Sequence, residues 1–345
     1  MKELFQRFIN HPKITLQLVI TTFVIALLGL ATSLFVIQVL NRYVSYGVNS
    51  TLTTLAVGTL IAVGFELTFR SLRSRLIIAQ NKEDNDQLSK VAFSTLLQTQ
   101  QPSLDQVSFG QRHEVLRGVD SIRAITMPQN VAAVLDLPFS LLFVFVLWLL
   151  SPTLALVSIS AMIISLLMAI IVQKSGKKDT KQVQEASAER SGVLGSAVSA
   201  AETIRVFNGS EFLSLAWVKC DSMVARLRGK LLLNRDTLQS KIGVVTSLQT
   251  VAIITVGAIQ AVNGDLSVGA MIGANILAGR ALMPITRLSQ MGETFATATQ
   301  SGNLLRGFMK LPLERMQGTG LKKYTGKIDL QGLSFSYPGS TVQLF

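Results

Sequence analysis

Six long, mostly apolar stretches constrain the fold of this chain more than any other feature. A bilayer core about 30 Å thick is crossed by about 20 helical residues, since each residue of an α-helix adds about 1.5 Å. The first stretch is too long for the core of a signal peptide, so it is expected to stay in the membrane. The sequence predicts an all-α polytopic membrane protein with helices at about 14–41, 52–79, 129–150, 153–173, 243–262 and 267–300.

Composition supports this class. Only 15% of the residues are charged, against roughly 25% in a soluble domain. The net charge of +12 flanks the apolar spans instead of forming a soluble basic surface, so no nucleic-acid partner is expected. The single cysteine, Cys220, excludes an internal disulfide, and no cluster of metal ligands accompanies it.

The distribution of Lys and Arg predicts the orientation. Basic residues precede the first span and gather after the second and the fourth, whereas the intervening short loops carry Arg42 alone. Both termini and two long segments, about 80–128 and 174–242, are therefore expected on the cytoplasmic side. Apolar residues at helical spacing in these segments predict helical stalks. Turns are expected near Pro102 and Phe109-Gly110 in the first and at Asn208-Gly209 in the second.

Several strings resemble the membrane domain of ATP-binding-cassette exporters. Asp265–Pro284, DLSVGAMIGANILAGRALMP, is similar to a stretch found in the type I secretion permease/ATPases that export RTX toxins, proteases and adhesins. Leu135–Val157 resembles the third-to-fourth hairpin of that family, and LPLER at Leu311–Arg315 resembles its linker. The resemblance implies a type I exporter membrane domain of six transmembrane helices with long cytoplasmic helical extensions.

The resemblance also implies a domain layout. A short cytoplasmic N-terminus, 1–13, would precede the transmembrane domain at 14–305 and a linker at 306–326. Residues 327–345 contain LSFSYPG and resemble the first β-strand of a nucleotide-binding domain, in which Tyr337 would stack on adenine. The family's phosphate-binding motif G-x-x-x-x-G-K-[ST] does not occur in these 345 residues. ATP and Mg are therefore expected as cofactors of a full-length parent. This polypeptide alone is expected neither to bind these cofactors nor to hydrolyse ATP.

Two turn regions of the stalks are candidates for coupling to an ATPase domain. Glu202–Trp217 resembles the second coupling-helix region, where Glu202, Phe207, Phe212 and Trp217 would meet a groove on the motor. Phe109 and Gly110 have the corresponding place in the first stalk. The alternative interpretation is that the aromatic side chains pack between stalk helices.

Charged residues within the spans are candidates for the translocation path, because charges in a membrane are costly and usually face protein or water. Glu66 and Arg70 lie four residues apart on one helix and can pair. Asp136 lies in the third span and Arg280 in the sixth. These residues are expected either to line a polar path or, in the case of Glu66–Arg70 and Arg280, to form structural ion pairs.

The predicted function is an ATP-driven exporter half that moves an unfolded secreted polypeptide across the bacterial inner membrane as a homodimer. Expected partners are a second copy of the chain, a nucleotide-binding domain, a periplasmic adaptor, an outer-membrane channel and the secreted polypeptide. Two alternatives stay open, an exporter of lipid, drug or small peptide with the same fold, and a non-transporting membrane fragment.

Overall fold

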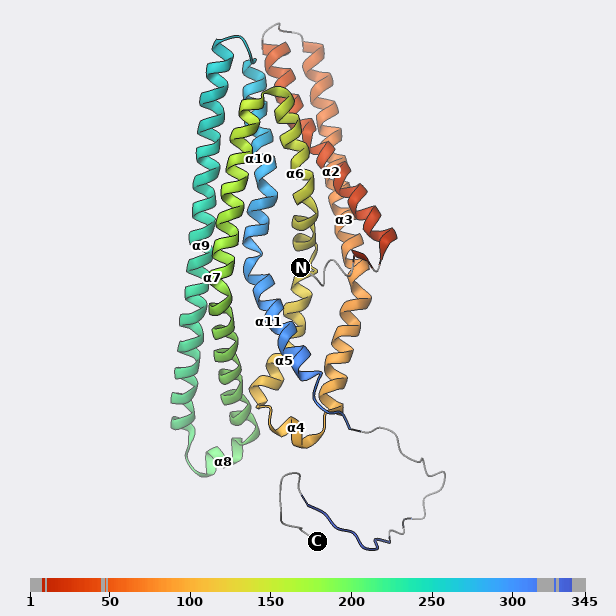
Figure 1. Ribbon diagram of the computed structural model, residues 1–345, viewed down its shortest axis with the longest axis vertical. Helices are drawn as coiled ribbons and strands as arrows, with labels where there is room; N and C mark the ends of the chain where they lie inside the picture. Colours follow the sequence, from red (N-terminus) through yellow and green to blue (C-terminus); the bar gives the residue numbers. More distant parts are fainter. Residues whose placement is uncertain are drawn as a thin grey trace.

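The computed structural model describes residues 8–9, 11–44, 47, 49–314, 326 and 329–336, and for 173–175 and 177 it describes the backbone alone (Figure 1). Along the chain, the elements are α2 (Pro12–Gln38), the π-helix η1 (Val39–Val44), α3 (Asn49–Gln98), α4 (Gln101–Asp105), α5 (Phe109–Ile125), α6 (Pro128–Leu150), α7 (Pro152–Ser199), α8 (Ala201–Val206), α9 (Ser210–Val262), α10 (Val268–Gln290) and α11 (Gly292–Phe308).

Six of the described helical segments are long and apolar enough to cross a membrane. They confirm the predicted all-α, six-span fold in the described part of the chain. The last predicted span, 267–300, is divided at Met291, where α10 ends and α11 begins. Pro284 does not end α10, although proline removes a backbone donor, because membrane helices tolerate proline where neighbours supply other bonds.

The molecule is elongated, and α3, α7 and α9 run along most of its length (Figure 1). The short helices α4 and α8 lie at one end, which we call the α4/α8 end, and the α6–α7 and α9–α10 turns lie toward the other. At 53 residues α9 extends about 80 Å, far more than a bilayer core requires. The apolar half of each long helix thus continues into a polar half, which forms the predicted extensions.

Local sequence explains how the extensions turn. Ser108 and Gln111 form a capping box that starts α5, so the expected turn lies directly before Phe109, and Phe109 and Gly110 themselves lie in the first helical turn. Pro102 likewise lies in the first turn of α4, where its missing N–H costs nothing. Asn208 has a φ of 52°, a left-handed conformation that asparagine tolerates, and it separates α8 from α9 as predicted.

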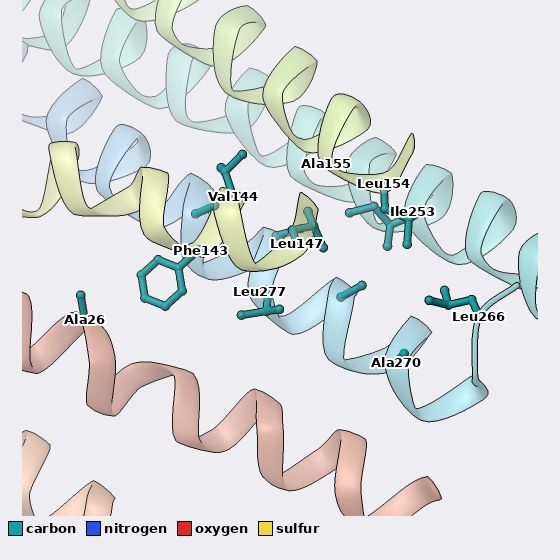
Figure 2. Close-up of a cluster of buried hydrophobic side chains, with 13 residues drawn as sticks. Ala26, Phe143, Val144, Leu147, Leu154, Ala155, Ile253, Leu266, Ala270 and Leu277 are labelled. Atoms are coloured by element: carbon teal, nitrogen blue, oxygen red, sulfur yellow. The ribbon is translucent and has the colours of Figure 1, made fainter. Parts of the chain in front are cut away.

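The largest buried apolar cluster lies between α6, α7, α9 and α10, with Ala26 of α2 at its edge (Figure 2). Leu147, Leu154 and Ile253 are completely buried there. Small residues of α10 let helices approach closely, since a Cβ at Gly273 would overlap the side chain of Ile37 in α2. Close packing therefore accounts for the small-residue run in Asp265–Pro284.

The segment after α11 returns to the first extension. Leu313 forms an isolated antiparallel bridge with Thr99, the N–H of Gln100 donates to the carbonyl oxygen of Pro312 at 2.9 Å, and the N–H of Glu314 donates to that of Gln98 at 2.6 Å. A β-strand was expected within 327–345. The described residues of that range, 329–336, do not form one. Strands are defined by pairing, and these residues show no ladder to another described segment.

Candidate functional site: a charged cavity in the membrane bundle and an exposed tip

A cavity of about 390 Å³ opens between α2, α3, α6 and α10. Its charged lining comes from three of these helices and consists of Glu66, Arg70, Asp136, Arg280 and Arg287. Thr22, Ile25 and Ala26 of α2, together with Phe139, Phe143, Met283 and Pro284, supply the rest of the wall. The structure therefore brings the four predicted path residues, which span more than 200 positions of sequence, around one space.

Glu66 and Arg70 form the predicted pair on α3. One carboxylate oxygen of Glu66 accepts from Arg70 Nε at 3.0 Å and from Nη2 at 2.6 Å. Glu66 is 9% exposed and Arg70 is half-buried. The pair is local to one helix, as the i,i+4 spacing requires, and it also faces the cavity, so the two interpretations of this pair are compatible.

Asp136 on α6 lies between two guanidinium groups, and neither contact was predicted from the sequence. Arg73 Nη1 donates to Asp136 Oδ1 at 2.5 Å, and Arg287 Nη1 lies 3.5 Å from Oδ2. Arg73 is 4% exposed, and its Nη1 also lies 3.4 Å from Thr22 Oγ1. Arg73 is one of the basic residues that gather after the apolar part of the second span and are expected in a cytoplasmic segment, so its burial against Asp136 is a correction. The available signal was its spacing of seven residues from Glu66, which places both on one face of α3.

Arg280 reaches across the bundle from α10 to α2. Its Nη2 donates to Thr32 Oγ1 at 2.8 Å. The guanidinium lies over Gly29, where an added Cβ would come within 2.6 Å of Nη1. Among the described residues, no carboxylate lies within 4 Å of Arg280, so the structural ion pair considered for this residue is not formed there.

The exposed tip of the second extension is apolar. Val206, Phe207 and Phe212 are each more than 75% exposed, and Glu202 is exposed beside them on α8. Large apolar side chains at this exposure suggest an unfilled contact surface. Sequence analysis had named all of these except Val206, which lies in the same turn.

Trp217 differs from the phenylalanines of the tip. It is half-buried and lines a groove between α7, α8 and α9 with Val193, Ala197 and Leu213. The Arg190 guanidinium lies 5.8 Å from the centroid of a Trp217 ring, and Arg190 also pairs with Asp221 at 2.7 Å. For this residue the contacts favour packing within the extension.

Phe109 and Gly110 join the two extensions. A Cβ at Gly110 would overlap the carbonyl oxygen of Ala188 on α7, and one at Gly195 would overlap the Phe109 ring. Phe109 is nevertheless 57% exposed, so part of the ring stays open to a partner. Tyr337, the predicted adenine-stacking residue, lies outside the described residues.

These features define a class of protein. Six apolar spans in the described residues, long helical extensions at one end and a charged cavity among the spans define a polytopic helical membrane domain. The family model described as ABC transporter transmembrane region matches residues 15–284, and the chain belongs to this family.

Known relatives are consistent with that assignment. The chain is 25% identical over 330 residues to the leukotoxin translocation ATP-binding protein LktB of Mannheimia haemolytica, and equally to those of Bibersteinia trehalosi and Mannheimia glucosida. The match covers 95% of this chain and 47% of each relative, so the chain spans about half the length of these proteins. A solved bacterial Atm1-family ABC exporter with ATP bound has the same fold, with a TM-score of 0.68 and 16% identity over 86% of this chain and 53% of that one.

Proposed function

We propose that this chain is the membrane-spanning half of an ATP-driven exporter that moves an unfolded secreted polypeptide across the bacterial inner membrane. The observation that carries the proposal is the similarity to leukotoxin translocation proteins along 95% of the chain. The charged cavity fits such a role, because a polypeptide in transit carries polar groups that need partners inside the membrane.

Two copies of the chain would form the pathway, and ATP with Mg would bind to a nucleotide-binding domain. The tip formed by α8 supports the docking part of this proposal, since its exposed Phe207 and Phe212 suit an apolar groove on that domain. A periplasmic adaptor and an outer-membrane channel would continue the path beyond the inner membrane.

The same proposal places the α4/α8 end and both termini in the cytoplasm. Single cysteines at Glu202 and Asp265 test this orientation, because both positions are exposed and lie at opposite ends of the molecule. The test uses a Cys220→Ser background, which removes the native thiol. Partial burial and nearby Glu189 raise the pKa of that thiol, so its own labelling at neutral pH would already be slow. An impermeant thiol reagent should label position 265 in intact cells, and position 202 only after lysis. The reverse pattern would invert the topology.

Export of lipid, drug or small peptide is the competing function, because the fold is shared with exporters outside the leukotoxin group. The discriminating experiment joins the chain, after Gln331, to the ATP-binding domain of an LktB relative in nanodiscs. We expect unfolded leukotoxin to raise ATP hydrolysis, and a fluorescent phospholipid or a drug-like dye to leave it unchanged. A fusion whose added domain lacks its phosphate-loop lysine is the blank. Stimulation by the lipid or dye, with no response to polypeptide, would favour the competing function.

A further inference from the structure

The charges around the cavity do not balance. Two carboxylates, Glu66 and Asp136, face four guanidinium groups on the surrounding helices, those of Arg70, Arg73, Arg280 and Arg287. The ion pairs account for three of these guanidiniums, because Arg70 pairs with Glu66 while Arg73 and Arg287 share Asp136. Among the described residues, no carboxylate lies within 4 Å of Arg280, and Glu66, which acts on it electrostatically, is already hydrogen-bonded to Arg70.

The guanidinium of Arg280 has donors to spare. Arginine offers five N–H donors and stays charged in proteins, and the hydrogen bond to Thr32 uses one of them. A cation in a membrane bundle is costly when no carboxylate contacts it directly, and Arg280 shares the carboxylate that acts on it, Glu66, with Arg70. The cavity beside Arg280 has room for an anionic group that would relieve this cost.

Position within the membrane helps to identify the source of the anion. Arg280 lies near the middle of α10, about 18 Å from its first residue and about 15 Å from its last. Lipid phosphates lie at the surfaces of a hydrocarbon core about 30 Å thick, so a headgroup at its normal depth does not reach the centre. A polypeptide that crosses the bundle brings its side-chain carboxylates to this depth.

We propose that the cavity is a transient binding site for acidic side chains of the exported polypeptide, with Arg280 as the group that binds each passing carboxylate. The inference rests on the proposed function and narrows its substrate class to polypeptides with acidic segments. Arg280 would form a two-bonded contact with a carboxylate, as guanidinium geometry allows, while Phe139, Phe143 and Met283 contact the neighbouring apolar atoms of the cargo.

Peptide binding to the 345-residue chain tests the proposal. The chain is placed in nanodiscs of zwitterionic phosphatidylcholine, and the probes are two 20-residue Gly/Ser peptides with an uncharged dye. One peptide contains four Asp and the other four Asn at the same positions. We expect the Asp peptide to bind about tenfold more tightly in fluorescence anisotropy, the size of one charge-assisted hydrogen bond, and to lose this advantage as salt rises.

Variants assign the preference to one residue. Arg280→Gln should bind the Asp peptide no better than the Asn peptide, and Arg280→Lys should recover part of the difference. Arg75→Gln is the matched control, because Arg75 lies on α3 close to the cavity residues, is exposed and does not line the cavity. It should keep the native preference within about twofold, the change expected for a screened surface charge. Unchanged binding of the Asn peptide shows that Arg280→Gln is folded.

Several results would overturn the proposal. Equal affinity of the native chain for the two peptides would do so without any variant, and it would leave polypeptide export standing. An Asp preference that survives Arg280→Gln would place the anion site elsewhere. Displacement of the Asp peptide by short-chain phosphatidylglycerol, but not by phosphatidylcholine, would make the site one for lipid headgroups. Failure to bind either peptide would count against both this proposal and polypeptide export.

Discussion

Replacing Asp136 by Asn should destabilise the bundle more than any other single removal of an acidic residue in the described spans. Arg73 depends on this carboxylate, and its side chain is 5% exposed, against 17% for Asp136. Removing one partner of a buried pair costs about 3–5 kcal/mol, because the other charge is left without compensation. We expect a cost near 3 kcal/mol, since Asp136 borders a cavity and Arg287 loses only a 3.5 Å contact.

Thermal unfolding of the purified chain in detergent, followed by far-ultraviolet circular dichroism, is the assay. A cost of this size predicts a fall of roughly 6 °C or more in the apparent melting temperature, by the usual scaling for large domains. Asp120→Asn is the control, because Asp120 is 78% exposed and its 3.5 Å contact with Arg123 is a surface ion pair worth about 0–1 kcal/mol.

A double-mutant cycle identifies the cause of the loss. Adding Arg73→Met to Asp136→Asn removes the uncompensated charge, so the double variant should melt above Asp136→Asn alone. If Asp136→Asn and Asp120→Asn have the same melting temperature, the Arg73–Asp136 pair contributes little to stability and the charge argument is wrong. Additive losses in the double variant would show that the two side chains act independently, for example through packing.

Further predictions concern the extensions and the segment after α11. Gly110→Ala should lower the melting temperature, because a Cβ would overlap the backbone of α7, whereas Gly229→Ala enters open space and should raise it slightly or leave it unchanged. In the exporter restored with an ATP-binding domain, Phe212→Ala should reduce export per ATP hydrolysed without changing the melting temperature. Trp217→Ala should lower the melting temperature, because it removes packing within the extension. A lower melting temperature for Phe212→Ala, with reduced export per ATP for Trp217→Ala, would reverse these roles. Glu314→Pro should speed hydrogen exchange in the bridged segment near the end of α3, because it removes a backbone donor, while Glu314→Ala should not; equal exchange in both variants would mean that this bond is not formed in solution.

Local pattern was sufficient to predict the spans and the pair on α3. The length of an apolar segment that can cross a membrane is set by the thickness of the bilayer, about 20 residues. The contact between Glu66 and Arg70 depends only on helix geometry. The Asn208-Gly209 turn was predictable for the same reason, since it rests on the backbone preference of Asn.

Contacts between distant segments were not predictable from one sequence. Arg73 follows a span and resembles the basic residues of a loop, and only the packing of α3 against α6 brings it to Asp136, 63 positions away. The hydrogen bond from Arg280 to Thr32 joins residues 248 positions apart. Phe109 and Trp217 carry the same aromatic signal as Phe212, and only their neighbours show that Phe109 and Trp217 also pack within the extensions.

The cavity and the α4/α8 end are joined by one unbroken helix. Glu66 and Arg73, which hold charges at and beside the cavity, lie on α3, and α3 continues to Gln98, about 37 Å beyond Arg73. There the carbonyl oxygen of Gln98 accepts from the N–H of Glu314. Along the chain, this segment follows α11, which is separated from α10 at Met291. Because α3 has no such break, one continuous helix carries both the carbonyl group that pairs with Glu314 and charged residues at and beside the cavity.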